Sequence, residues 1–151
     1  MPEMLALTLH RPWAWAIVGA PAPHAKRIEN RSWAPWPRAL GQRIALHAGR
    51  KWDQEGALLV ERYLAFAASL ADADHPQGII GTARIVRAFR RDAADFAALC
   101  PASQEHWAFG PWCWVLADVR SLPEPIPCRG RQGLWEMPSA LVAKIRSQGG
   151  L

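Results

Sequence analysis

The sequence predicts an α+β fold in which helices pack on a small, largely antiparallel β-sheet or barrel. The chain has 151 residues, which fit a single domain over residues 1–151, and half of them are apolar, so it can bury a sizeable core. About five or six short segments alternate apolar and polar residues, which is typical of strands with one buried face. Helical segments lie between them, but without the regular strand–helix repeat of a doubly wound parallel sheet.

Alternation of apolar and polar residues predicts where the strands lie. We expect strands over residues 4–10, from about residue 27, over 43–49, 78–90 and 113–120, and a proline-broken final strand region over 122–137. The alternation directs these side chains into one core: Leu7, Ile44, Leu46, Ile80, Ile85, Val115 and Leu116. The segment 34–42 is expected to be irregular, because it carries several turn-forming residues.

Helices are predicted from helical spacing and from capping residues. The clearest spans 53–71, where apolar residues recur at helical spacing and Asp53 can cap the N-terminus. Pro12 and Pro138 suit the first position of a helix, and Asp92 can cap a third one. Shorter helices are therefore expected over 12–20, 92–99 and 138–147.

The charge of the chain permits an anionic partner. The net charge is +5 and the pI about 9.7, which is compatible with nucleic acid but explained equally well by an arginine-rich composition bias. The distribution is more informative, because no acidic residue occurs between Asn30 and Lys51, while arginines alternate there with Trp33 and Trp36. Such interleaving suits a phosphate backbone with stacked bases; the alternative is a solvated face with the tryptophans supporting the proline-rich loop.

A second basic segment, "RGRQGLW" at 129–135, contains two glycines that allow close backbone approach; the alternative is an ordinary tight turn. The two segments together give the predicted contacts to a nucleic-acid backbone: Arg38, Arg43, Arg50, Lys51, Arg129 and Arg131.

The remaining composition excludes several classes. Cys100, Cys113 and Cys128 form no C-x-x-C pair, and residues 13–22 are too short for a secretion signal, so we expect reduced thiols and a cytoplasmic protein. No apolar run is long enough to span a membrane. The histidines lack metal-ligand spacing, so we expect neither a metal nor a cofactor.

The stretch "KRIENRSW" at 26–33 concentrates charge unusually for a globular chain. Strict alternation divides it between two faces of a strand, with Arg27, Glu29, Arg31 and Trp33 on one and Ile28, Asn30 and Ser32 on the other. One face therefore carries a charge cluster that ends in an aromatic ring. This pattern fits either a solvated edge strand or the floor of a binding site.

Four segments in order resemble the ASCH domain, the activating-signal-cointegrator homology domain. They are "LHRPWAWAIV" (9–18), "KRIENRSW" (26–33), "RIALHAG" (43–49) with "GIIGTARIV" (78–86), and "WVLADVRSLPEPIPCRGRQGLWEM" (114–137). The resemblance covers nearly the whole chain. It implies a PUA-like mixed or antiparallel β-barrel with flanking helices and a cleft between them. Members of this family are thought to bind RNA or DNA, and some small bacterial members deacylate N4-acylated cytidine.

The resemblance also implies which residues line the cleft. The ligand would meet Trp13, Lys26, Glu29, Arg31 and Trp33, while Asn30 would hold backbone in place. Lys26 and Glu29 face oppositely in a continuous strand, so their convergence requires Lys26 to lie before the strand begins.

The amidohydrolase members of the family use a Lys, a Thr three residues later and a downstream Glu. Lys26 matches the first, Glu29 replaces the Thr, and Glu105 is a loose candidate for the third. A carboxylate beside Lys26 would stabilise its ammonium form and weaken it as a base, which favours binding over catalysis.

Three functions remain open. The first is a binding module for RNA, DNA or a modified nucleotide, with RNA favoured. The second is an amidohydrolase acting on an N4-acylated cytosine nucleoside, with Lys26, Glu29 and Glu105 as catalytic residues. The third is a protein-interaction module without a nucleic-acid ligand. Turnover of an N4-acylcytidine would separate the second from the first.

Overall fold

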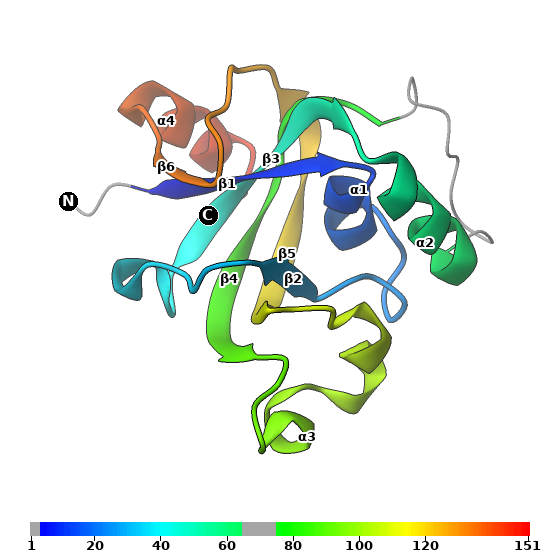
Figure 1. Cartoon of the computed structure of the whole chain (residues 1–151). Coiled ribbons are helices and arrows are strands. Elements are labelled where there is room, and N and C mark those ends of the chain that lie inside the picture. The colour runs from blue at the N-terminus through cyan, green and yellow to red at the C-terminus, as the bar shows by residue number, and fades with distance from the viewer. Residues whose placement is uncertain (1–3, 65–74) are drawn as a thin grey trace.

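The protein folds around one six-stranded mixed sheet, with helices at both of its ends (Figure 1). The computed structural model describes residues 4–64 and 75–151. The strands are β1 (Leu5–Arg11), β2 (Ile28–Arg31), β3 (Arg43–Trp52), β4 (Gly78–Arg90), β5 (Trp112–Ile126) and β6 (Leu134–Glu136). The helices are α1 (Trp13–Val18), α2 (Gln54–Leu64), α3 (Phe96–Leu99) and α4 (Ser139–Ser147), with 3-10 turns η1 (Pro37–Ala39) and η3 (Ala102–Trp107).

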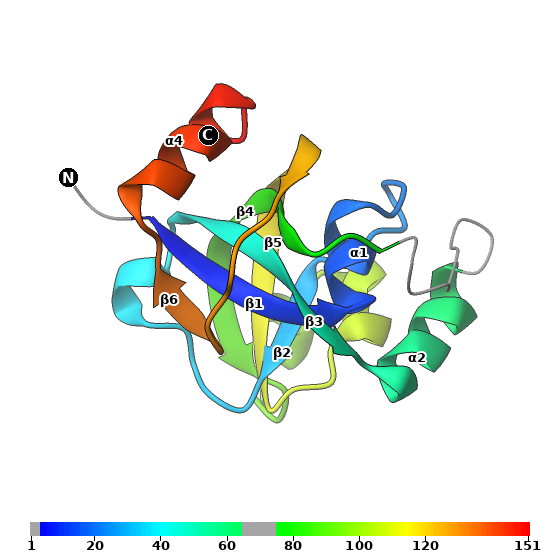
Figure 2. The same ribbon diagram turned by 90° about the horizontal axis from the view of Figure 1, so that it is seen from above.

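The sheet has the order β2-β5-β4-β3-β1-β6. Every neighbouring pair is antiparallel except β1 and β3, which run parallel with Leu7 opposite Leu46. Seen from above, the strands curve into a half-barrel (Figure 2). This arrangement confirms the predicted α+β class and the largely antiparallel sheet.

The strand β5 is longer than the sequence predicts. It continues through Pro123 and Pro125 to Ile126, so the first part of the expected final strand belongs to β5. Proline lacks an N–H group and is tolerated where a strand has no neighbour on one side. The neighbour β2 pairs only with Trp112–Val115, and the prolines lie beyond that pairing.

The main core lies under the centre of the sheet, where Leu7, Ile44 and Leu46 are completely buried. All the predicted core residues belong to this cluster except one. Val115 packs instead in a second cluster with Trp107 and Cys113, because it and Leu116 are neighbours on β5 and project to opposite faces.

The helices follow their capping signals with one exception. Asp53 caps α2, where its Oδ1 accepts a hydrogen bond from the Gly56 N–H at 2.8 Å; residues 65–71 of that predicted helix lie outside the described part. The prediction for 92–99 is wrong at its start. Asp92 accepts a hydrogen bond from Arg90 instead of capping, and α3 begins only at Phe96.

The helices flank the sheet at opposite ends: in both views α1 and α2 lie at one end and α4 at the other (Figures 1 and 2).

Cys100, Cys113 and Cys128 are free thiols. Among residues 4–64 and 75–151, no helix has the length and apolarity that crossing a membrane requires.

Candidate functional site

A cleft of about 350 Å³ opens beside β1 and β2. Its walls come from β1, the start of α1, the segment 26–31, the residue before α2, and two loops that contribute Phe109 and Gln132. Among the residues predicted to meet a ligand, the cleft is lined by Trp13, Lys26, Glu29 and Arg31.

The charged residues of the 26–33 stretch form one cluster in this cleft. Lys26 lies before β2 begins, as its convergence with Glu29 requires, and its Nζ is 3.6 Å from Glu29 Oε1. The second carboxylate oxygen, Oε2, accepts a hydrogen bond from Arg31 Nε at 2.7 Å. Arg31 Nη2 also donates to the Thr8 carbonyl at 2.8 Å, which ties the cluster to β1. We call Lys26, Glu29 and Arg31 the charged triad.

Lys26 is the most deeply buried member of the charged triad, with 2% of its surface exposed. Its Nζ donates to the Ile28 carbonyl. Burial lowers the pKa of Lys26, while the Glu29 carboxylate opposes this shift and Arg31 adds to it. The sequence indicated the opposite direction, because it shows the neighbouring carboxylate but not the burial of the amine.

Trp13 forms a fixed aromatic wall beside the charged triad. Its indole N–H donates to Asp53 Oδ2 at 2.7 Å, and Lys26 Nζ lies 5.2 Å from the centre of its ring. Burial alone would raise the pKa of Asp53, but hydrogen bonds from the Gly56 N–H and the Trp13 indole hold that pKa below its ordinary value. Asp53 is therefore an anion that caps α2 and orients Trp13 together.

Asn30 holds backbone, as the family resemblance implies. Its Oδ1 accepts hydrogen bonds from the N–H groups of Phe109 and Gly110, each at 2.8 Å. Its Nδ2 donates to the Trp107 carbonyl at 2.9 Å. One side chain on β2 thus fixes the loop that carries Phe109 to the cleft.

Two predicted site residues lie outside the cleft lining. Glu105 is exposed on η3, so the third catalytic group of the amidohydrolase reading is not brought to Lys26. Trp33 packs its ring edge-on against Trp114, with centroids 5.0 Å apart, and lies against the main core. Both rings therefore lie beside the charged triad: Trp13 lies beside Lys26 in the cleft, and the centre of the Trp33 ring is 6.0 Å from Arg31 Cζ.

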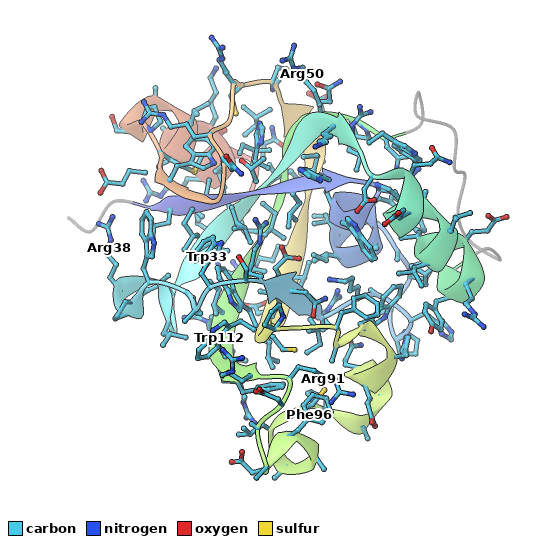
Figure 3. All side chains as sticks on the ribbon, in the orientation of Figure 1. Trp33, Arg38, Arg50, Arg91, Phe96 and Trp112 are labelled. Atoms are coloured by element: carbon cyan, nitrogen blue, oxygen red, sulfur yellow. The ribbon has the colours of Figure 1, made fainter. Side chains whose placement is uncertain are left out.

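The basic residues of the segment from Asn30 to Lys51, which we call the basic window, do not form one surface. Arg38 pairs with Glu136 at 2.8 Å, and Arg43 pairs with Asp118. Figure 3 shows Arg38 and Arg50 on separate sides of the molecule. The physical reason is that the window runs from β2 through η1 and along the whole of β3, which crosses the sheet.

The second basic segment lies closer to the site. Arg129 and Arg131 are exposed on the loop between β5 and β6, and the next two residues, Gln132 and Gly133, line the cleft. Within residues 4–64 and 75–151, neither arginine forms an ion pair.

Trp33→Ala should act mainly on stability. Because the ring packs on Trp114 and the core, its removal should lower the free energy of unfolding by about 3 kcal/mol. The affinity of the folded protein for a cleft ligand should change little. Urea denaturation measures the free energy of unfolding, and titration measures the affinity for the ligand. A strong loss of ligand affinity with an unchanged free energy of unfolding would show that Trp33 contacts the ligand.

Sequence reasoning missed several lining residues, above all His10, Asp53, Phe109 and Gln132. Asp53 was recognised only as a cap, and Phe109 lies in a loop without periodicity. The "GP" pair at 110–111, a turn signal, is the only local sign that the chain bends there.

No group of three His, Cys, Asp or Glu side chains within the described ranges could hold a metal ion.

Comparison with known proteins supports the fold. No family model matches the sequence, and no curated protein matches it. A crystal structure of a point mutant of the ZmASCH protein from Zymomonas mobilis matches the fold with a TM-score of 0.54. The match covers 97% of this chain and 98% of that one, at 18% sequence identity. The chain therefore shares the fold of ZmASCH, a mixed six-stranded half-barrel with flanking helices, in agreement with the predicted resemblance to an ASCH domain.

Proposed function

We propose that the cleft binds the base of a nucleotide, and that the natural ligand is single-stranded RNA. The observation that carries this proposal is the convergence of the charged triad and the Trp13 ring in a cleft of about 350 Å³. A cleft of this size lies in the range of small-molecule sites, and an aromatic wall with few placed polar groups is typical of them.

The charges of the lining balance. Lys26 and Arg31 supply two cations, and Glu29 and Asp53 supply two anions. A lining with this balance suits a neutral ligand with both donors and acceptors better than it suits a phosphate group. A nucleobase is such a ligand, and its flat ring can stack on Trp13.

The charged triad supplies complementary hydrogen-bonding groups for a base edge. The amine of Lys26 and the guanidinium of Arg31 can donate to a base carbonyl. The Glu29 carboxylate has lone pairs beyond those used by Arg31, and can accept from an exocyclic amine such as N4 of cytosine. A base with both groups on one edge is therefore the preferred ligand.

Equilibrium titration with labelled RNA tests the proposal. Ten-nucleotide homopolymers of each base, followed by fluorescence anisotropy at low salt, should show saturable binding with a preference among the bases. A protein-interaction module would bind none of them. Absence of binding to all four strands and to the four free nucleosides would overturn the proposal.

Replacing Arg129 and Arg131 by Ala should flatten the salt dependence of RNA binding. A phosphate contact in single-stranded RNA contributes about 0.7 to the slope of log K against log salt, so the double variant should lose about 1.4. Arg38→Ala is the control, because that guanidinium is bound to Glu136 and does not line the cleft. An unchanged slope in the double variant would show that the phosphates lie elsewhere.

One observation favours a second function, hydrolysis of an N4-acylated cytosine nucleoside. The lowered pKa of Lys26 makes its amine more available as a base than the sequence suggested. Glu105 lies outside the cleft, and Glu29 stands where the family's Thr would be, so binding remains the first proposal. Release of acetate from N4-acetylcytidine above background, lost in Lys26→Met, would make the protein an amidohydrolase.

A further inference from the structure

We propose that Phe109 and Trp13 together form an aromatic corner that receives an unpaired base, and that Asn30 is the positioning residue for it. The inference rests on the proposed function, and it adds the residue that stacks on the ligand and the requirement that the base be unpaired.

Phe109 presents a solvent-exposed aromatic ring to the cleft. It lines the cleft and is 44% exposed, although it is one of the larger apolar side chains of the protein. Its ring faces Trp13, with centroids 6.3 Å apart and an angle of 62° between the planes. The two rings therefore form adjoining walls that meet at an angle.

The exposure of Phe109 does not come from a loose loop. Asn30 accepts hydrogen bonds from the N–H groups of Phe109 and Gly110 and donates to the Trp107 carbonyl, so the backbone is fixed on both sides of the ring. Gly110 has a φ of +74°, and a Cβ there would lie 2.5 Å from Arg91 Cβ. The loop is thus built tightly and still presents an apolar ring to the cleft.

The Trp13 wall is equally fixed. Its indole is held by Asp53, and its ring packs edge-on against the fully buried Trp107, with centroids 6.2 Å apart. Trp107 also belongs to the segment that Asn30 holds. Both walls therefore rest on the same support, and their angle is a property of the folded protein before any ligand binds.

This geometry restricts how a base can enter. Because the planes meet at 62°, one base can lie face to face with only one ring and meets the other with its edge, an arrangement that aromatic pairs favour. The polar edge of the base then reaches the charged triad at the same cleft. In a duplex that edge is engaged with the opposite strand, so only an unpaired base can satisfy the site.

Substitutions at Phe109 test the stacking role. Phe109→Leu keeps apolar bulk without a ring, and we expect it to weaken binding of the preferred ten-nucleotide RNA by about 5- to 150-fold. Phe109→Tyr keeps the ring and should bind within about twofold of the wild type. Trp36→Ala is the control, since Trp36 is 36% exposed and lies outside the cleft; it should bind as the wild type does.

A double-mutant cycle tests the positioning role of Asn30. If Asn30 acts through Phe109, Asn30→Ala should weaken binding in the wild type but have a much smaller effect in the Phe109→Leu background. Equal effects in both backgrounds would show that Asn30 does not act through the ring. Denaturation of each variant identifies any that fail to fold. If an Asn30 variant does not fold, the Phe109 substitutions still test the stacking role.

The outcomes separate this inference from the proposed function. If the wild type binds single strands and Phe109→Leu binds them equally well, the aromatic corner is wrong and base binding stands. If the same RNA binds equally well when annealed to its complement, the requirement for an unpaired base is wrong. If the wild type binds no RNA and no nucleoside, both proposals are wrong.

Discussion

Glu29→Gln should lower the free energy of unfolding by about 3–5 kcal/mol at neutral pH, the cost expected when one member of a buried charge cluster is removed. Glu29 lies between Lys26 and Arg31, and it is the only anion that contacts either of them within the described residues. Without it, two cations face each other, and one of them is 2% exposed. Urea denaturation at pH 7 measures the loss.

The loss should depend on pH in a defined direction. Burial lowers the folded-state pKa of Lys26 below its ordinary value of 10.5, so the unfolded chain holds this proton more strongly. Stability therefore rises with pH over the window between the folded-state pKa and 10.5. Glu29→Gln lowers the folded-state pKa further, so the stability gap to the wild type should narrow over the pH range between the folded-state pKa values of the variant and of the wild type, and stay constant above that range. A gap that widens as the pH rises would contradict this account of Lys26.

The same variant probes recognition. Glutamine at position 29 would donate as well as accept, so the preference for a base with an exocyclic amine should weaken and one for a base carbonyl should strengthen. Titrations at equal folded fraction, with all four homopolymers, measure this change. An unaltered base preference would remove Glu29 from base recognition.

Lys26→Met should weaken RNA binding by about 10- to 150-fold, which corresponds to a hydrogen bond with a charged partner. Its effect on stability should be small or favourable, because Glu29 keeps its 2.7 Å bond to Arg31 and the cost of burying an ammonium disappears. The two readouts thus move in different directions, unlike those of a variant that merely unfolds.

Lys144→Met is the matched control for that experiment. Lys144 is exposed on α4, which lies at the end of the sheet away from α1 and α2 (Figures 1 and 2). It removes the same charge from the chain and should leave both affinity and stability nearly unchanged. Equal weakening by the two substitutions would indicate a general effect of net charge instead of a contact in the cleft.

Much of the fold could be predicted from the alternation of apolar and polar residues along short segments of the sequence. Alternation placed Leu7, Ile44 and Leu46 in the core because each strand has one face against it. Features set by pairing were not accessible in the same way. Two prolines are tolerated within β5 because β2 pairs only with Trp112–Val115, and the start of α3 depends on Arg90 holding the Asp92 carboxylate.

The site shows the same division. Alternation within one short stretch predicted that Glu29 and Arg31 share a face, and the family resemblance added Lys26. Strand geometry then required Lys26 to lie before the strand begins. The burial that lowers the pKa of Lys26 comes from distant segments and leaves no local signal. Likewise the backbone of Phe109 at the cleft is hydrogen-bonded to Asn30, which lies on an element far away in the sequence.

The indole N–H signals of the tryptophans, observed by heteronuclear NMR while single-stranded RNA is added, test the central claim most directly. Variants Trp13→Phe and Trp36→Phe assign the two signals needed. We expect the Trp13 signal to shift with saturation, because its indole lies in the cleft, and the Trp36 signal to stay in place. Saturating RNA that moves the Trp36 signal and leaves the Trp13 signal unchanged would contradict base binding in this cleft.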